Sequence, residues 1–377
     1  MATSGALKGR AVTVVGAGIG GLTAAIALAR RGAQVTVLEQ AAALSEVGAG
    51  IQISANAVRA LDALGLAPAL ADHALRNTGV RLHDDAGRVV LQMDLLRHRP
   101  HARFLVIHRP RLIDVLHQAA LDAGVALHLG QRIETPPEGL VIAADGLKSP
   151  LRQHLNGQQV PFFTGQSAWR ATIPDAGADQ AVAQVFMGPG RHLVSYPLAH
   201  GIRNIVAVVE RRDWQDEGWS HADDPANLRA AFAGFGGPVQ GWLSQVRDVS
   251  IWGLFRHPVA ARWHDDRLAL LGDAAHPTLP FLAQGAGMAI EDAWTVAACL
   301  DADADTGAAL ARYQAIRQPR VTRIVQAAND NARNYHLQGV KRRAAHGVLR
   351  LADRFAPRLM PGRFDWLYDY DPVTDRP

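Results

Sequence analysis

The sequence has very little cysteine: its 377 residues include only Cys299, which excludes an intramolecular disulfide. Such scarcity is typical of proteins in a reducing compartment. No stretch reaches the roughly 18 consecutive apolar residues that a membrane-spanning helix needs. The N-terminal segment also lacks the apolar core of a signal peptide. We therefore expect a cytoplasmic protein without a membrane span.

Several catalytic signatures are also missing. There is no pair of cysteines and no His-Glu-x-x-His segment, and the histidines are scattered, so we expect no metal site. No Gly-x-Ser-x-Gly segment is present either, which argues against a hydrolase nucleophile.

A basic cluster, Lys341 to Arg343, contributes to the formal net charge of +4. Apolar residues recur beside it at helical spacing: Leu337, Val340, Ala344, Val348, Leu351 and Phe355. We interpret the cluster as the solvated face of an amphipathic C-terminal helix, with a membrane surface or a partner as alternatives. No nucleic-acid partner is expected.

The most informative segment of the chain is a glycine-rich turn between two short apolar runs. Gly16, Gly18 and Gly21 form Gly-x-Gly-x-x-Gly, and Glu39 ends the second run about 20 residues later. The first glycine permits a tight turn, the second lets the backbone approach a pyrophosphate, and the third lets helix and strand pack closely. The acid accepts a hydrogen bond from a ribose hydroxyl, and the helix dipole favours the phosphate charge. The segment predicts a dinucleotide site built from a strand, a helix and a strand at 11–15, 22–31 and 35–38.

The periodicity of the remaining chain predicts two kinds of layer. Alternating residues between 165 and 211 indicate long antiparallel strands, unlike the buried parallel strands of the opening unit. Further elements are expected as helices at 54–71 and 109–121, a hairpin at 80–94, strands at 125–129, 140–144 and 268–271, and C-terminal helices. A dinucleotide unit with a sheet inserted into it favours a flavoprotein over a plain nicotinamide dehydrogenase.

Two further segments place a carboxylate at the end of a predicted strand. Asp145-Gly146 follows one apolar run and Gly272-Asp273 follows another. In open α/β sheets, ligands bind outside the carboxyl ends of the strands. The second segment continues into a predicted helix through Gln284, Gly285, Ala286, Gly287 and Met288. The amides at the start of this helix would stabilise negative charge on a reduced flavin ring.

With these three elements in order, nearly the whole chain resembles the single-component, FAD-dependent aromatic hydroxylases. These are the p-hydroxybenzoate-hydroxylase-like flavoprotein monooxygenases, and the likeness is greatest to the salicylate, 3-hydroxybenzoate and 6-hydroxynicotinate branch. The resemblance implies that the glycine turn and Glu39 bind the ADP part of FAD. It also implies a flavin contact from Arg109, a role of Asp145-Gly146 toward FAD and the nicotinamide donor, and a ribityl contact from Asp273.

Two departures from the family pattern are visible. Gln52 stands where 6-hydroxynicotinate enzymes have a histidine, which weakens that substrate assignment; we still expect Gln52 to contact the cofactor. The segment between Gly124 and Asp145 is too short for the extra β-meander that the family usually has, so the FAD-binding domain should be trimmed.

The resemblance also implies a reaction. NADH or NADPH reduces FAD, O2 adds to the ring at C4a, and the resulting hydroperoxide transfers oxygen to a small aromatic, phenolic acid. This chemistry requires a dry pocket and benefits from a base that accepts the phenol proton. The enzyme is expected to act as a monomer or homodimer.

The predicted strand around residue 192 supplies the candidate base. His192 and Tyr196 share one face of a strand, and the resemblance gives this pair the role of holding and deprotonating the substrate. Gln284 and Pro280 are expected to position the substrate. His276 is an alternative base, although a structural hydrogen bond explains it equally well.

The resulting prediction is an α/β fold with a discontinuous Rossmann-like FAD-binding domain, an inserted antiparallel-sheet substrate domain and C-terminal helices. The expected boundaries are 1–75, 103–158 and 257–300 for the FAD-binding domain, 76–102 and 159–256 for the substrate domain, and 301–377 for the helical region. Three alternatives remain open: a ring hydroxylase of quinone or other secondary metabolism, an FAD-dependent dehydrogenase or oxidase that inserts no oxygen, and a non-catalytic flavin or lipid carrier.

Overall fold

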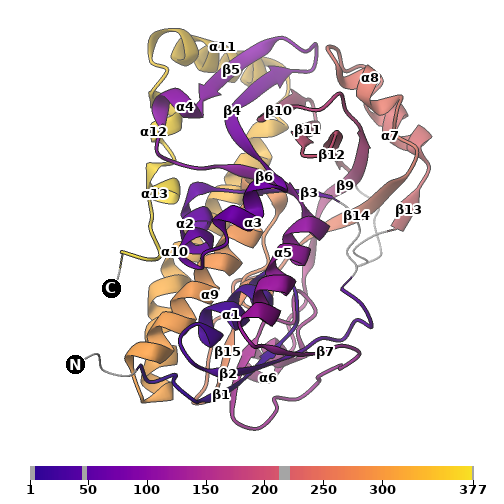
Figure 1. The fold of residues 1–377 in the computed structure, drawn as a ribbon. Coiled ribbons are helices and arrows are strands. Elements are labelled where there is room, and N and C mark those ends of the chain that lie inside the picture. The colour runs from indigo at the N-terminus through magenta and orange to yellow at the C-terminus, as the bar shows by residue number, and fades with distance from the viewer. Residues whose placement is uncertain (1–4, 45–48, 212–220, 376–377) are drawn as a thin grey trace.

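A parallel sheet forms the base of the molecule. The computed structural model describes residues 5–44, 49–211 and 221–375, and the lower half of Figure 1 contains five strands in the order β15-β8-β1-β2-β7. The strands are Ala11–Val15 (β1), Gln34–Leu38 (β2), Ala126–His128 (β7), Leu140–Ala143 (β8) and Leu268–Leu270 (β15). Every pairing between them is parallel. Their carboxyl ends therefore share one edge of the sheet.

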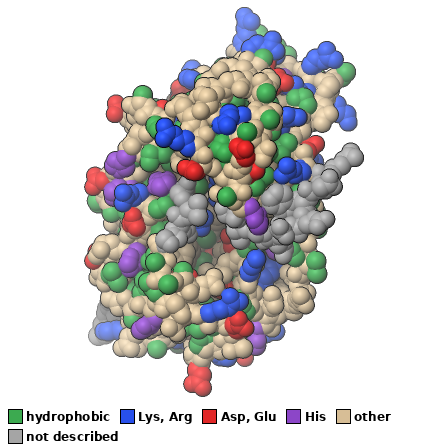
Figure 2. Space-filling model, turned by 90° about the vertical axis from the view of Figure 1, so that its right-hand side faces the viewer, with side chains coloured by type: hydrophobic (Ala, Val, Ile, Leu, Met, Phe, Trp, Pro, Cys, Tyr) green, Lys and Arg blue, Asp and Glu red, His purple; other side chains and the backbone are tan. Residues whose placement is uncertain are grey.

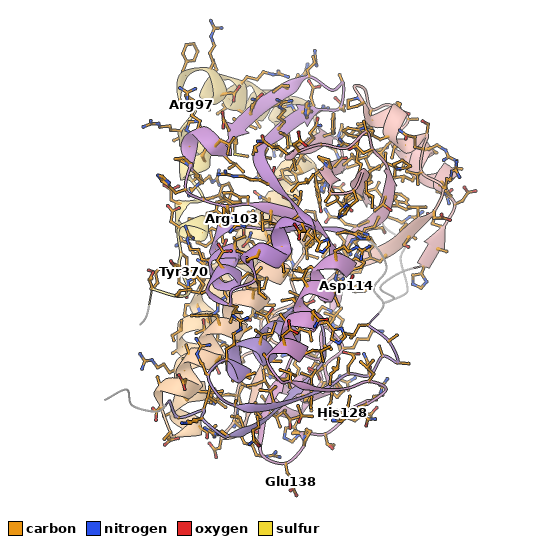
Figure 3. All side chains as sticks on the ribbon, viewed as in Figure 1. Arg97, Arg103, Asp114, His128, Glu138 and Tyr370 are labelled. Carbon is orange, nitrogen blue, oxygen red and sulfur yellow. The ribbon has the colours of Figure 1, made fainter. Side chains whose placement is uncertain are left out.

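Burial explains why these short apolar segments are strands. All residues of β8 and β15 are buried, as in parallel sheets covered on both faces. Helices Ile19–Ala29 (α1), Arg109–Asp122 (α5) and Gly285–Ala302 (α9) bury apolar residues in the same core cluster. The described link from β7 to β8, residues 129–139, contains no strand, and Glu138 extends from its lower end in Figure 3. The domain is therefore trimmed at the place where the sequence predicted it.

A second sheet of ten strands occupies the upper half of Figure 1, in the order β13-β14-β9-β12-β11-β10-β4-β6-β3 with β5 beside β4. Its strands are Gly50–Ile53 (β3), Ala74–Asp84 (β4), Val89–Asp94 (β5), Leu105–His108 (β6), Phe162–Pro174 (β9), Gln180–Gly188 (β10), Arg191–Leu198 (β11), Ile202–Glu210 (β12), His221–Asp223 (β13) and Val249–Arg256 (β14). The predicted hairpin and long strands are present.

The strands predicted between residues 165 and 211 pair in antiparallel fashion, but the sheet also contains one parallel pairing. β10 pairs with β4 in parallel, because β4 comes from a distant part of the chain and is not joined to β10 by a hairpin. β3 and β6 also join this sheet, although both lie in segments expected to belong to the FAD-binding domain. The second sheet therefore extends further toward the parallel sheet than the periodicity indicated.

The remaining helices of the described chain include the expected C-terminal ones, which are the last four of the ten. They are Ala55–Ala63 (α2), Ala67–Ala71 (α3), Leu95–His98 (α4), Pro150–Asn156 (α6), Pro225–Ala231 (α7), Val239–Leu243 (α8), Thr306–Tyr335 (α10), Gly339–Phe355 (α11), Leu359–Gly362 (α12) and Asp365–Tyr368 (α13), with 3₁₀ turns at Gly272–Ala274 and Pro280–Leu282. The single helix predicted at 54–71 is instead α2 and α3. The break contains Gly65, whose φ of +64° is the left-handed conformation in which helices commonly end.

The prediction for the C-terminal amphipathic helix is wrong about which side of the helix packs against the rest of the protein. Four of the apolar residues that defined it are between 59% and 74% exposed: Val340, Val348, Leu351 and Phe355. The buried side of α11 instead carries His346 and the partly buried Leu349, and Asp353 accepts a hydrogen bond from the amide of Gln92 on β5 (2.8 Å). No described helix is long and apolar enough to cross a membrane.

Candidate active site

The glycine turn after β1 is closely packed on one side and open on the other. A Cβ on Gly16 would lie 2.4 Å from the carbonyl oxygen of Ala144, and one on Gly21 would lie 1.9 Å from the carbonyl oxygen of Gly16. Gly16 also has a φ of +100°. A Cβ on Gly18 would meet nothing within 4 Å. The turn therefore leaves open space in front of Gly18, at the start of α1, where a phosphate can approach the helix amides.

Glu39 lies across this turn at the carboxyl end of β2. Its Oε2 accepts a hydrogen bond from the amide of Ala17 (2.7 Å), and its Oε1 accepts one from the amide of Ala41 (2.8 Å). These contacts hold the carboxylate beside the glycines, where the predicted ribose contact requires it.

The two other strand-end carboxylates lie on the same edge of the parallel sheet. Asp145 follows β8, next to the Gly16 turn, and burial raises the pKa of its carboxyl to about 6. Asp273 follows β15. Burial raises its pKa too, and the charges of His276 and Arg109 oppose this shift. The structure therefore places Arg109 close enough to Asp273 for its charge to act on that carboxyl.

The N-terminus of α9 lies beyond this edge. Gln284 is the residue that precedes the helix, and Gly285, Ala286 and Gly287 form its first turn, so their amides have no acceptor within the helix. The amide of Met288 donates to the carbonyl oxygen of Gln284 (2.8 Å), and the Met288 side chain is buried in the core. The first turn is therefore a site for negative charge.

A cavity of about 450 Å³ lies between this helix start and the second sheet. Gln52 on β3, His192 on β11 and Gln284 all line it. Most of its wall is apolar: Val80, Leu82, Leu91, Met93, Phe104, Val185, Met187, Val194, Phe281, Leu349 and Met360. Figure 2 shows the surface hollowed between the upper and lower halves of the molecule. A pocket of this size and polarity fits a small organic ligand.

Gln284 is held rigidly at the wall of the cavity. Its side chain is buried, and its Oε1 accepts from Ser54 Oγ (3.2 Å) and Asn56 Nδ2 (3.3 Å). Its Nε2 donates to the carbonyl oxygen of Leu282 (3.3 Å). Ser54 and Asn56 lie at the start of α2, so contacts distant in sequence fix the orientation of this amide.

His192 has one ring nitrogen engaged behind the cavity wall. Its Nδ1 lies 2.7 Å from Nε2 of His336, and its ring contacts those of Phe281 and Tyr335 at centroid distances of 5.6 and 5.1 Å. Burial and the neighbouring His336 hold the pKa of His192 well below its usual range. The ring is therefore neutral at pH 7 and keeps Nε2 for a ligand.

The structure does not bring Tyr196 to the same cavity. Tyr196 does not line the cavity; it is buried in a cluster with Val106 and Leu198, and a Cβ on Gly50 would lie 2.8 Å from its ring. Burial raises the pKa of its hydroxyl. Four residues along a strand span about 13 Å, so two side chains on one face can reach different pockets.

The family model described as an FAD binding domain matches residues 10–139 and 138–328. Over 398 residues, the chain is 35% identical to the 3-amino-4-hydroxybenzoate 2-monooxygenase PtmB3 of Streptomyces platensis, with 97% of this chain and 98% of that protein covered. Over 393 residues it is 33% identical to the 3-hydroxybenzoate 6-hydroxylase of Polaromonas naphthalenivorans, with 96% of each covered. The chain belongs to the FAD-dependent aromatic hydroxylases.

A solved structure shows the same fold. Klebsiella pneumoniae HpxO, complexed with FAD and uric acid, matches with a TM-score of 0.79 and 27% identity, over 92% of this chain and 94% of that one. The hydroxylase described here has the features that FAD requires. These are the open glycine turn, a carboxylate held beside it, strand-end acids on one edge and a helix start with free amides.

A buried ion network that was not predicted joins α9 to α10 in the hydroxylase. Arg317 on α10 pairs with Glu291 (2.6 Å) and Asp292 (2.7 Å) on α9, and Asp292 also contacts Nε2 of His276 (2.5 Å). His276 is therefore a structural partner of Asp292 rather than a base in the cavity. Two adjacent acids, Glu291 and Asp292, in an apolar helix were a visible signal of a buried ion pair. Their basic partner could not be identified in the same way, because it lies 25 residues away from Asp292.

No group of three or more His, Cys, Asp or Glu side chains suited to a metal ion occurs among residues 5–44, 49–211 and 221–375.

Proposed function

We propose that this hydroxylase uses NADH or NADPH and O2 to hydroxylate a small aromatic acid that carries a phenol group. The observation that carries the proposal is the position of His192, a neutral base in an otherwise largely apolar cavity. Gln284, at the start of α9, lies in the wall of the same cavity. The relatives are named for the hydroxylation of hydroxybenzoates, which agrees with a phenolic substrate.

The residues divide into a cofactor set and a substrate set. Gly16, Gly18, Gly21 and Glu39 hold the adenosine half of FAD, while Arg109, Asp145, Asp273 and the first turn of α9 hold its flavin half. When bound, FAD supplies the oxygen-activating chemistry. His192 accepts the phenol proton at Nε2 and thereby makes the aromatic ring more electron-rich. Gln284 orients the substrate, and the apolar wall excludes water.

The apolar wall of the cavity favours a second candidate substrate. The wall formed by Leu82, Met187, Leu349 and Met360 is apolar. A phenolic acid with an apolar substituent would pack against this wall. The aurachin C monooxygenase of Stigmatella aurantiaca is 32% identical to this chain over 340 residues.

The test measures NADH and NADPH oxidation by the purified FAD-loaded protein in the presence of aromatic acids. The panel contains salicylate, 3-hydroxybenzoate and 3-amino-4-hydroxybenzoate, each with and without an alkyl substituent. We expect at least one acid to stimulate oxidation and to yield a product heavier by one oxygen atom in mass spectrometry. Absence of stimulated oxidation and of hydroxylated product across the panel would reject the proposal.

A His192→Ala variant separates chemistry from cofactor binding. Loss of a general base lowers turnover by about 100-fold or more, whereas FAD content should not change. His101→Ala is the matched control, since His101 is exposed and lies outside the cavity. Equal losses of turnover and of bound FAD in His192→Ala would indicate a structural role.

A further inference from the structure

A chain of hydrogen bonds leads from His192 away from the cavity. Nδ1 of His192 lies 2.7 Å from Nε2 of His336, and Nδ1 of His336 lies 3.0 Å from Oε1 of Glu210. His336 directly follows the last residue of α10, and Glu210 is the last residue of β12. Two neighbouring paired strands, β11 and β12, therefore meet the end of the distant helix α10 to form one line of contacts.

The two ends of this line have different environments. His192 is 2% exposed and faces the cavity, whereas the Glu210 side chain is 49% exposed. His336 lies between them and is buried. The line therefore connects a water-poor cavity with solvent.

We propose that His192, His336 and Glu210 conduct the phenol proton from the cavity to solvent. The inference rests on the proposed hydroxylase function. Initially each histidine carries its proton on Nδ1: His192 donates to His336, and His336 donates to Glu210. The substrate O–H bond breaks as His192 Nε2 takes the proton. His192 Nδ1 passes its proton to His336 Nε2, and His336 Nδ1 passes its proton to the Glu210 carboxylate.

This transfer leaves both rings neutral, and no redox change occurs. One proton leaves the substrate oxygen and one arrives at Glu210, which releases it to solvent. Burial lowers the pKa of His192 and of His336, so a transfer that forms no imidazolium suits this environment. A lone buried base would have to hold the charge instead.

A fourth residue stabilises the state after transfer. Nε2 of Gln166 lies 3.2 Å from Nδ1 of His336. While Nδ1 carries a proton, it donates to Glu210; once Nδ1 has lost the proton, it accepts from the Gln166 amide. Both tautomers of His336 therefore have a partner.

The first test needs no substrate. Histidine-labelled, FAD-loaded protein is studied by ¹⁵N NMR, with His336→Gln and His192→Gln used to assign the signals. We expect His192 and His336 to be neutral and protonated on Nδ1 at pH 7. An imidazolium signal or protonation of His192 on Nε2 would overturn the proposal, whether or not the protein hydroxylates anything.

The second test compares turnover of the panel acid that is hydroxylated. His336→Gln keeps a donor and an acceptor but cannot pass a proton, so kcat should fall on the order of 10-fold or more with KM and FAD content unchanged. Glu210→Gln should lower kcat by a smaller factor, and Glu210→Asp should restore most of it. Glu134→Gln, an exposed carboxylate paired with Arg132, is the control.

The outcomes separate the two claims. No turnover by the wild type rejects the proposed function. If the wild type turns over and the kcat of His336→Gln lies within about twofold of the wild-type value, the proton path alone is rejected. An imidazole at position 336 would then not be needed. A fall in thermal stability or in FAD content that parallels the fall in kcat would also reject it in favour of a structural role.

Discussion

Arg317 and Asp292 form an ion pair, 2.7 Å from Nε to Oδ1, in which neither side chain is exposed. Asp292 also accepts a hydrogen bond from the amide of Gly272 (3.1 Å), the residue before the predicted ribityl ligand Asp273. One buried carboxylate therefore ties α10 to α9 and to the turn that presents Asp273.

Loss of the arginine should destabilise the fold severely. Arg317→Met leaves the Glu291 and Asp292 carboxylates buried without the guanidinium charge that offsets theirs. This lowers the free energy of unfolding by about 3–5 kcal/mol. Urea denaturation measures this cost. Arg333→Met, on the same helix with an exposed side chain, should change the free energy by less than about 0.5 kcal/mol. Similar effects of the two substitutions would contradict the importance of the ion network.

The glycines of the first turn should fall into two classes. Gly18→Ala adds a Cβ that meets no protein atom within 4 Å, so the fold should survive while FAD binding weakens. Gly21→Ala places a Cβ 1.9 Å from a backbone oxygen and should destabilise the apoprotein itself. Flavin absorbance after gel filtration and the Tm of the apoprotein distinguish the classes. Normal FAD content in Gly18→Ala would argue against close phosphate approach at this residue.

Asp145 should make the stability of the apoprotein depend on pH. Its folded pKa, about 6, lies above the usual value of an unfolded aspartate, near 3.9. The folded state therefore holds the proton more tightly, and stability falls as pH rises through this interval. Relative to the wild type, Asp145→Asn should gain about 2 kcal/mol between pH 4 and pH 7. A constant difference in the free energy of unfolding across this range would show that burial does not raise this pKa.

Two leucines on α11 test which side of that helix is packed. Leu349 lies against the β4–β5 cluster, whereas Leu351 is 59% exposed. Leu349→Ala should therefore cost about 1–2 kcal/mol, and Leu351→Ala less than about 0.5 kcal/mol. Chemical denaturation of both variants measures the difference. A larger cost for Leu351→Ala would restore the packing predicted from the sequence.

Local patterns predicted the strands of the parallel sheet well. The glycine turn, Glu39, Asp145 and Asp273 each follow an apolar strand, and the structure places all four strands in one parallel sheet. Short apolar runs that are buried on both faces are typical of parallel sheets, in which the carboxyl ends of the strands share one edge. The pairing of β4 with β10 was not predicted, because no local signal reports which distant strands meet.

The amphipathic pattern of α11 led to the wrong packing for a related reason. A helical period shows which residues share a face, but not which face meets the rest of the protein. His346 and Leu349 pack inward because β5 lies on that side, and the position of β5 is a tertiary property.

By itself the sequence determined the dinucleotide-binding unit, because the glycine turn and its flanking strands depend on neighbours within a few residues. The cofactor class and the choice of His192 as a candidate base came from the resemblance of nearly the whole chain to a family. The tertiary structure alone decided what surrounds His192. It separated Tyr196 from the cavity, and it brought His336 and Glu210 from 144 and 18 positions away into one line. Hydrogen bonds of this kind form only after sheet and helix have packed, so no spacing along the chain encodes them.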